Sequence, residues 1–255
     1  MGKEILTPIV ESFNTEEKFL YNDSYLFIKG YACGRNLRNT LKALPLARTI
    51  HNGQYRKGET MINDVPYRLP YVLHVLKVTA TLISASLPLS DAELDILLSC
   101  ALLHDSLEDG KGFFKHEGRE LVTDYGFPER VYSVVKLLSK HQCATELELN
   151  HYFNAIKKDK YALLVKMADR SHNVEDLYVM PTDKLHKYVK ETRDYIYPLS
   201  TYAKAHYPEL SNGVTILKSK IVSLTELTET LVNKYDVELR LKDKEIAELK
   251  KQLGQ

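Results

Sequence analysis

The sequence predicts an all-α fold, and three observations lead to this prediction. Apolar residues recur three and four positions apart through most of the 255 residues, which is the period of an amphipathic helix. Short clusters of Gly, Pro, Asn and Asp interrupt these stretches, as connections between helices do. The alternating pattern of a strand is rare. With 44% hydrophobic residues, the chain can form one good-sized core, or a core with an appendage.

We divide the chain into three parts on this basis. Residues 1–40 are expected to form an N-terminal helical flank, residues 41–210 the main helical domain, and residues 211–255 a C-terminal helix. The exception to the helical pattern is the segment 58–70, which contains Asn63-Asp64 and two prolines. Such a composition predicts a loop or a small hairpin.

The clearest helix start lies at Ser90, which can cap a helix together with Glu93 three residues later. We expect this helix to run from residue 91 to residue 109. Its apolar stripe passes through Ala101 and then meets Asp105, where the core face would continue. Burying an unpaired carboxylate is costly. Either something positive lies there, or the end of the helix has emerged from the core.

A second long helix is expected over residues 159–180, ended by Pro181. One face carries apolar residues together with Asp169, Asn173 and Leu177, so a carboxylate again interrupts an apolar stripe.

The C-terminal part changes in composition. Residues 214–255 contain no proline, and Gly254 is their only glycine. Leucines and a tyrosine follow spacings of three and four, with Lys242 as a polar break, and the last turns are strongly charged. We predict a long helix with a narrow apolar seam that packs along the body or pairs with a second chain as a coiled coil. A solvated helix that docks nowhere is the alternative.

Charge and cysteine content exclude several classes of partner. The formal net charge is +1, so the protein has no global field to hold nucleic acid or an anionic membrane surface. No window approaches the ~18 apolar residues of a membrane span. The three cysteines, Cys33, Cys100 and Cys143, fit no paired pattern, and residues 1–10 do not resemble a signal peptide. We expect a cytoplasmic protein whose anionic ligand is held by local cations or by a metal.

Residues 104–109, His-Asp-Ser-Leu-Glu-Asp, are the first chemical constellation. In a helix, residues four apart stack about 6 Å apart on one face. Glu108 then lies one turn beyond His104, and Asp109 lies one turn beyond Asp105. The first level offers metal ligands, and the second can act on an attacking water. Alone, Glu108 and Asp109 would most simply be a solvated helix end.

Two further residues complete a metal-binding set. His74 stands in the apolar stretch YVLHVLKVTATLI, and Asp169 stands on its own apolar stripe. Two histidines and two aspartates suit a borderline divalent metal such as Mn, Fe, Co or Zn, with positions open for water and a phosphate oxygen. Taken singly, His74 could be a hydrogen-bonded core histidine, and Asp169 could form an ion pair with Arg170.

These residues resemble the HD-domain phosphohydrolases and, more narrowly, the hydrolase domain of RelA/SpoT-type (p)ppGpp enzymes. The resemblance covers roughly residues 41 to 210 and rests on five segments in the family's order: HNGQYRK (51–57), PYVLH (70–74), ALLHDSLED (101–109), LVKMADRSHN (164–173) and ETRDYIYPL (191–199).

The resemblance implies a bundle of about ten helices with one metal, usually manganese, that hydrolyses the 3′-pyrophosphate of ppGpp or pppGpp to GDP or GTP plus pyrophosphate. It assigns the metal to His74, His104, Asp105 and Asp169. It makes Glu108 and Asp109 the catalytic pair that orients and activates water. It places Arg56 against the guanine, with Lys57 and Asn173 also facing the nucleotide. Without the resemblance, Arg56 and Lys57 would fit a solvated basic turn.

The chain departs from the family pattern in three places. The stretch from Gly58 to Leu69 is longer than the family's usual link, and Glu175 stands where the family often has arginine. Both bear on the choice of nucleotide. The third departure is that no synthetase or regulatory region follows, so we expect a stand-alone small alarmone hydrolase, with a homodimer through the C-terminal helix as a possible assembly.

Two other functions stay open from the sequence. The same metal chemistry could act on another nucleotide, for example by removing a phosphate from NADPH. Alternatively, the chain could be a catalytically silent protein that binds a nucleotide and assembles through its tail. The presence of both Glu108 and Asp109 favours an enzyme, because silent relatives lose these acids.

Overall fold

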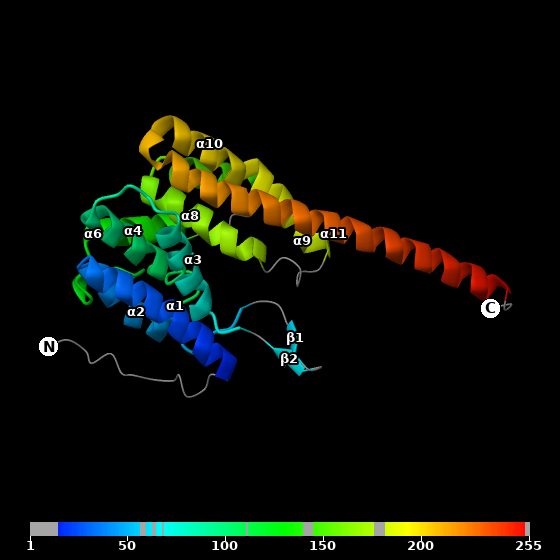
Figure 1. Ribbon diagram of the computed structural model, residues 1–255, viewed down its shortest axis with the longest axis horizontal. Helices are drawn as coiled ribbons and strands as arrows, with labels where there is room; N and C mark the ends of the chain where they lie inside the picture. Colours follow the sequence, from blue (N-terminus) through cyan, green and yellow to red (C-terminus); the bar gives the residue numbers. More distant parts are fainter. Residues whose placement is uncertain are drawn as a thin grey trace.

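In a computed structural model of the protein, the described residues form a helical assembly with a small hairpin (Figure 1). The structure describes residues 15–56, 60–62, 65–67, 69–110, 112–139, 145–175 and 182–252. Its elements, in order, are α1 (Thr15–Gly34), α2 (Arg38–Ile50), β1 (Thr60–Ile62), β2 (Val65–Tyr67), α3 (Val72–Ser84), α4 (Asp91–Leu103), α5 (Glu120–Thr123), α6 (Glu129–Leu138), α7 (Glu146–Ile156), α8 (Lys160–Asn173), α9 (Thr182–Glu191), the π-helical turn η2 (Thr192–Ile196), α10 (Tyr197–His206), the 3₁₀ turn η3 (Pro208–Leu210) and α11 (Ser211–Gln252). The all-α prediction is confirmed.

One core unites most of these helices. Helix α3 packs against α1, α4 and α8, while α4 also packs against α2, α6 and α8. Leu76 on α3 and Leu97, Leu98 and Leu102 on α4 are at most 1% exposed. Burying a leucine side chain stabilises the fold by roughly 1.5–3 kcal/mol. Helices α3 and α4 therefore present buried faces to this core. The predicted boundary at residues 40 and 41 falls within α2.

Helix α4 begins as predicted and ends earlier. Ser90 and Glu93 form a full capping box. The helix ends at Leu103 instead of residue 109, and residues 104–109 are turns. The Ser106 hydroxyl donates to the Leu103 carbonyl at 2.6 Å and so takes up an acceptor that a continuing helix would use. Gly110 follows this turn. A Cβ there would lie 2.2 Å from the Ser106 carbonyl oxygen, so the close approach of the two backbone segments requires glycine.

Helix α8 also starts at a side-chain cap. One carboxylate oxygen of Asp159 accepts hydrogen bonds from the backbone amides of Tyr161 and Ala162. The helix ends at Asn173, before the predicted residue 180, and Val174 forms its C-cap. Leu177 and Pro181, which the sequence placed at the end of this helix, lie outside the described residues.

The segment before α3 contains the predicted hairpin. Strands β1 and β2 pair antiparallel, with Thr60 opposite Tyr67, and Figure 1 shows them standing out from the helical body. Tyr55 and Pro70 form an isolated bridge at the base. The departure from helical periodicity in this stretch was therefore a correct sign of strand structure.

The helices after α8 are tied back to it by a buried cation. The Arg170 guanidinium donates to Thr192 Oγ1 at 2.9 Å, pairs with Glu191, and lies 4.0 Å from the ring centre of Tyr188. Thr192 begins η2, the widened turn that precedes Pro198. Proline lacks an amide proton, so Pro198 cannot donate the hydrogen bond of a regular helix to the carbonyl four residues before it. The alternative in which Asp169 forms an ion pair with Arg170 is not observed, because Arg170 pairs with Glu191.

The last helix, α11, divides into two parts. Its first half packs against α8, α9 and α10, with Val214, Leu217 and Ile221 buried. Its second half projects beyond the body (Figure 1), and Leu239 and Ile246 are 59% and 50% exposed. Among the described residues, no helix is both long and apolar enough to cross a membrane.

Candidate metal centre and active site

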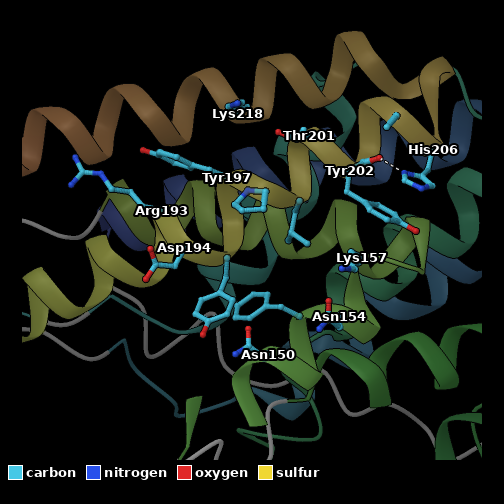
Figure 2. Close-up of a pocket in the computed structure, with 15 residues that line it drawn as sticks. Asn150, Asn154, Lys157, Arg193, Asp194, Tyr197, Thr201, Tyr202, His206 and Lys218 are labelled. Carbon is cyan, nitrogen blue, oxygen red and sulfur yellow. Dashed lines mark hydrogen bonds between the residues drawn. The ribbon is translucent and has the colours of Figure 1, made fainter. Parts of the chain in front are cut away.

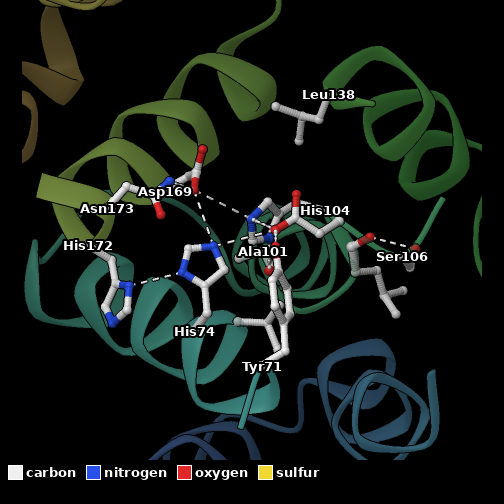
Figure 3. A network of polar contacts seen from close by, with 12 residues as sticks. Tyr71, His74, Ala101, His104, Ser106, Leu138, Asp169, His172 and Asn173 are labelled. Atoms are coloured by element: carbon white, nitrogen blue, oxygen red, sulfur yellow. Dashed lines mark hydrogen bonds and ion pairs between the residues drawn. The ribbon is translucent and has the colours of Figure 1, made fainter. Parts of the chain in front are cut away.

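Two histidines and an aspartate converge at the centre of the helical body. His74 comes from α3, His104 caps α4, and Asp105 follows in the turn; one ligand atom from each lies within 4.8 Å of the others. Asp169 approaches from α8, with Oδ1 3.2 Å from His74 Nε2 and 3.8 Å from His104 Nε2. Figure 3 shows the two rings turned towards the Asp169 carboxylate. The four residues predicted as metal ligands thus come together from three elements.

The hydrogen bond of His104 decides which of its nitrogens faces the carboxylates as a lone pair. Nδ1 lies 2.8 Å from the Ala101 carbonyl oxygen, which can only accept, so Nδ1 carries a proton. In the neutral ring, Nε2 is then unprotonated. It lies 3.0 Å from Asp105 Oδ2, is buried, and has no hydrogen-bond partner among the described residues. A lone pair beside two carboxylates is unfavourable unless a cation lies between them, so the donor set fits a divalent metal ion.

The protonation equilibria show the same demand for positive charge. Burial alone would lower the pKa of His104, but Asp105 and Asp169 outweigh it and raise the pKa to about 10. Burial alone would raise the pKa of Asp105, yet His104 and His74 hold it well below its usual range. The pKa of Asp169 is also well below its usual range, because Lys166 and the two histidines outweigh its burial. Both carboxylates are therefore ionised.

A further histidine, His172, contacts the back of His74. The Nδ1 atoms of the two rings lie 2.9 Å apart, and Figure 3 shows His172 on the side of His74 away from the carboxylates. Burial, then His74 and Arg56, lower the pKa of His172 to about 2, so its ring is neutral. His172 belongs to the fourth motif, but no role for it was predicted from the sequence. The signal that could have identified it as part of the site is its position on the same helix as Asp169, three residues later.

Tyr71 is a second site residue that was not predicted from the sequence. Its hydroxyl donates to Asp105 Oδ2 at 2.6 Å, and its ring stacks on His51 with centres 4.9 Å apart. Burial, then Asp105 and Asp109, raise the pKa of the Tyr71 phenol, which therefore stays protonated and donates. Tyr71 precedes α3 directly, so it reaches the site from the same helix end as His74.

A hydrogen-bonded chain connects Asp169 to the predicted nucleotide-binding residues. Asn173 donates from Nδ2 to Asp169 Oδ1 at 2.5 Å and accepts from the Arg56 guanidinium at 2.8 Å. Lys166 donates to the other oxygen, Asp169 Oδ2, at 3.0 Å. Arg56 also lies 5.8 Å from the ring centre of Tyr71. Arg56 and Asn173 therefore lie beside the candidate metal ligands, as the sequence expected.

The remaining predicted site residues are Glu108, Asp109 and Lys57. Glu108 is exposed and Asp109 is half-buried; both lie in the turn that follows Asp105, whose carbonyl accepts both their amides. Gln54 donates to the Asp109 carbonyl at 2.8 Å and links this turn to the first motif, residues 51–57. Lys57 lies outside the described residues. The strict two-level helix face that we expected is wrong, because the helix ends before Glu108, although Asp109 keeps its backbone bond to Asp105.

Glu175, the charge reversal noted in the sequence, is paired. Its carboxylate forms an ion pair with Lys220 of α11, and both side chains are about two-fifths exposed. The negative charge is therefore met by the C-terminal helix. Part of the Gly58–Leu69 stretch lies outside the described residues.

A cavity of about 690 Å³ lies between α7, η2, α10 and α11 (Figure 2). None of the predicted site residues lines it. Its lining includes Phe153, Tyr195 and Tyr202, together with Lys157 and Lys218. The segment 191–199, the last motif of the resemblance, forms part of its wall. That motif thus contributes to this cavity and, through Thr192, to the anchoring of α8.

The chain contains an HD domain, since residues 71–174 match the family model of that name, and this span holds all four candidate metal ligands. It is also similar to curated (p)ppGpp hydrolases of the SpoT/Rel type. It is 29% identical over 175 residues to the guanosine-3′,5′-bis(diphosphate) 3′-pyrophosphohydrolase of Borreliella burgdorferi, which covers 65% of this chain and 22% of that protein.

The chain is also similar to further proteins. The chain is 27% identical over 194 residues to the bifunctional (p)ppGpp synthase/hydrolase SpoT of Escherichia coli, covering 74% of this chain and 25% of that protein. It is 34% identical over 134 residues to the GTP pyrophosphokinase rsh of Brucella ovis, covering 51% and 17%. A solved structure, reported as a metazoan ortholog of SpoT that hydrolyzes ppGpp, is 24% identical with a TM-score of 0.49, covering 74% of this chain and 95% of that one. The chain spans about a fifth of the length of the curated relatives it matches.

Proposed function

We propose that this protein hydrolyses the 3′-pyrophosphate of (p)ppGpp to GDP or GTP plus pyrophosphate, using one divalent metal, Mn²⁺. His74, His104, Asp105 and Asp169 would hold the metal. The observation that carries the proposal is the buried Nε2 of His104, which has no hydrogen-bond partner among the described residues and faces two ionised carboxylates. The activities named for the Borreliella and Escherichia relatives support the substrate.

The metal's contribution is electrostatic. A divalent ion in this donor set supplies Lewis-acid polarisation of a phosphoryl oxygen, which offsets charge that develops in the transition state. The net charge of the protein is only +1, so binding a concentrated anion depends on such local charge.

The chain's own residues divide the remaining work. The oxygen of a water molecule bonds to the phosphorus that is attached to the 3′ oxygen. The bond between this phosphorus and the 3′ oxygen breaks, and the 3′ oxygen receives a proton. We assign the orientation and deprotonation of the water to Glu108 and Asp109, which follow Asp105 in the same turn. Arg56, with Lys57 and Asn173, would bind the nucleotide; the Arg56–Asn173 bond holds the guanidinium beside the metal ligands.

Product identification tests the proposal. The purified chain is incubated with Mn²⁺ and ppGpp, and anion-exchange chromatography separates the nucleotides from pyrophosphate. We expect GDP and pyrophosphate in equal amounts, and their loss in Asp105→Ala. The absence of pyrophosphate release by the wild type would exclude this substrate. Orthophosphate release from NADPH in a parallel reaction would instead support the other enzymatic function raised by the sequence.

We also propose that the projecting half of α11 pairs with a second copy of the chain. Tyr235, Leu239, Ile246 and Leu249 are at least half exposed and keep the three-and-four spacing of a coiled-coil seam, apart from Lys242. The proposed place of action is the cytoplasm, which the unpaired thiols of Cys33 and Cys100 support.

A further inference from the structure

The contact between His74 and His172 constrains where their protons lie. Nδ1 of His74 on α3 and Nδ1 of His172 on α8 are 2.9 Å apart, with ring centres 4.9 Å apart. On the other side of the His74 ring, Nε2 lies 3.2 Å from Asp169 Oδ1 and 3.4 Å from Asp105 Oδ2. His74 is 1% exposed, so water does not compete freely for either nitrogen.

A hydrogen bond between two imidazole nitrogens needs one proton and one lone pair. If His172 donates, the proton of neutral His74 is on Nε2 and points at the two carboxylates. If His74 donates, Nε2 of His74 is a lone pair aimed at the same carboxylates. The first arrangement suits a site without a cation, whereas the second is the one that can ligate a metal.

We propose that His172 is a positioning residue that accepts a hydrogen bond from His74 Nδ1 and thereby holds His74 in the tautomer that ligates the metal through Nε2. The inference rests on the metal centre of the proposed function. It adds that loading the site reverses the direction of the Nδ1–Nδ1 bond. The proton of His74 moves from Nε2 to Nδ1, and that of His172 moves from Nδ1 to Nε2. Each ring keeps one proton, so the exchange is balanced.

The two histidines of the site differ in this respect. His104 donates from Nδ1 to the Ala101 carbonyl, an acceptor that cannot change its role. His74 meets a ring that can either donate or accept. Among the described residues, the contact with His172 is the one hydrogen bond recorded for His74 Nδ1. The affinity of the whole site for a metal should therefore depend on a residue that never touches the metal.

Two nearly isosteric variants separate this role from simple packing. In His172→Asn the side-chain oxygen is attached to Cγ, as Nδ1 is in histidine, so an acceptor stays at the same place. His172→Leu has a similar shape and offers no acceptor. Thermal unfolding without metal establishes that both variants are folded, and isothermal titration with Mn²⁺ measures their affinity.

We expect His172→Leu to bind Mn²⁺ about 10–100-fold more weakly than the wild type, and His172→Asn to recover most of this loss. Equal Mn²⁺ affinity in His172→Leu and wild type would overturn the proposal, as would an equal loss in both variants. With Zn²⁺ bound to ¹⁵N-histidine-labelled wild type, long-range ¹H–¹⁵N spectra should show His74 protonated on Nδ1. Protonation on Nε2 would also overturn it.

These measurements do not depend on turnover. If the wild type binds Mn²⁺ but leaves ppGpp intact, the proposed substrate is wrong, while the comparison of Asn and Leu still decides the role of His172. If the wild type binds no Mn²⁺, the metal centre is wrong and the role of His172 falls with it.

Discussion

The Tyr71 hydroxyl donates a 2.6 Å hydrogen bond to Oδ2 of Asp105, and this bond joins the start of α3 to the turn after α4. The same oxygen lies 3.0 Å from His104 Nε2 and 3.4 Å from His74 Nε2. The orientation of one candidate ligand is thus set by a phenol whose pKa is raised, first by burial and then by Asp105 itself.

Removing only this hydroxyl tests its contribution. Tyr71→Phe keeps the ring that stacks on His51 and frees Asp105 to rotate. We expect Mn²⁺ affinity to fall about 10-fold and the free energy of unfolding to fall by about 1 kcal/mol. Tyr207→Phe is the matched control, because its hydroxyl donates to the Lys158 carbonyl away from the site. Wild-type Mn²⁺ affinity in Tyr71→Phe would show that the bond does not position Asp105.

The proposed catalytic pair should affect turnover without affecting metal binding. Glu108→Gln and Asp109→Asn keep size and remove the charge that would take a proton from water. We expect kcat for ppGpp to fall at least about 100-fold in one or both, with Mn²⁺ affinity by titration unchanged. Glu238→Gln on exposed α11 serves as the control. Full activity in both variants would show that another residue deprotonates the water.

Arg56 should matter for binding more than for the chemical step. Arg56→Lys keeps the charge but loses the planar group that bonds to Asn173 and is suited to stacking on a base. We expect KM for ppGpp to rise about 10-fold, worth about 1.4 kcal/mol of binding, with a smaller change in kcat. Arg38→Lys, on an exposed arginine at the start of α2, should leave both constants unchanged. An unchanged KM in Arg56→Lys would show that the Arg56 guanidinium does not bind the nucleotide.

The cap of α4 predicts a pH dependence of stability. Hydrogen bonds from Lys160 and Ser90 lower the pKa of Glu93 to about 2, from a usual value of 4.5. A lowered folded-state pKa stabilises the protein above the unfolded value, and this stability is lost as pH falls from about 5 towards 2. Because the Glu93 side chain is 34% exposed, solvent screening keeps the effect at about 1 kcal/mol or less.

Urea unfolding measures this effect. At pH 7, Glu93→Gln should be less stable than the wild type, and the difference should shrink between pH 5 and pH 3. Glu226→Gln, farther along the exposed face of α11, provides a comparison for general charge effects. A difference that grows on acidification would contradict the assigned direction of the pKa shift.

The projecting seam of α11 predicts the oligomeric state. Leu239→Lys combined with Ile246→Lys places charges in the proposed interface, so a dimer seen by light scattering should become a monomer. Val237→Lys and Leu241→Lys alter equally exposed apolar residues off the seam and should leave the dimer intact. A monomeric wild type across the micromolar range would rule out self-pairing.

Local sequence patterns predicted the elements well where local physics determines them. The capping box at Ser90 and Glu93 needs residues only three apart, and it is present. The end of α4 was misjudged by six residues, because apolar spacing continues through His104 while the Ser106 hydroxyl and the tight approach at Gly110 stop the helix. These features depend on hydrogen-bond competition and on neighbouring atoms, neither of which a periodicity pattern reports.

The sequence by itself determined the all-helical class, the HD motif and the residue types of the candidate site, because helical period and ligand chemistry are properties of the residues alone. Only the tertiary structure decided which atoms face one another. It brought His172 behind His74 and Tyr71 onto Asp105, and it turned Glu175 towards Lys220. These pairs are separated by 34 or more positions, and only the packing of α3, α4, α8 and α11 sets their distances.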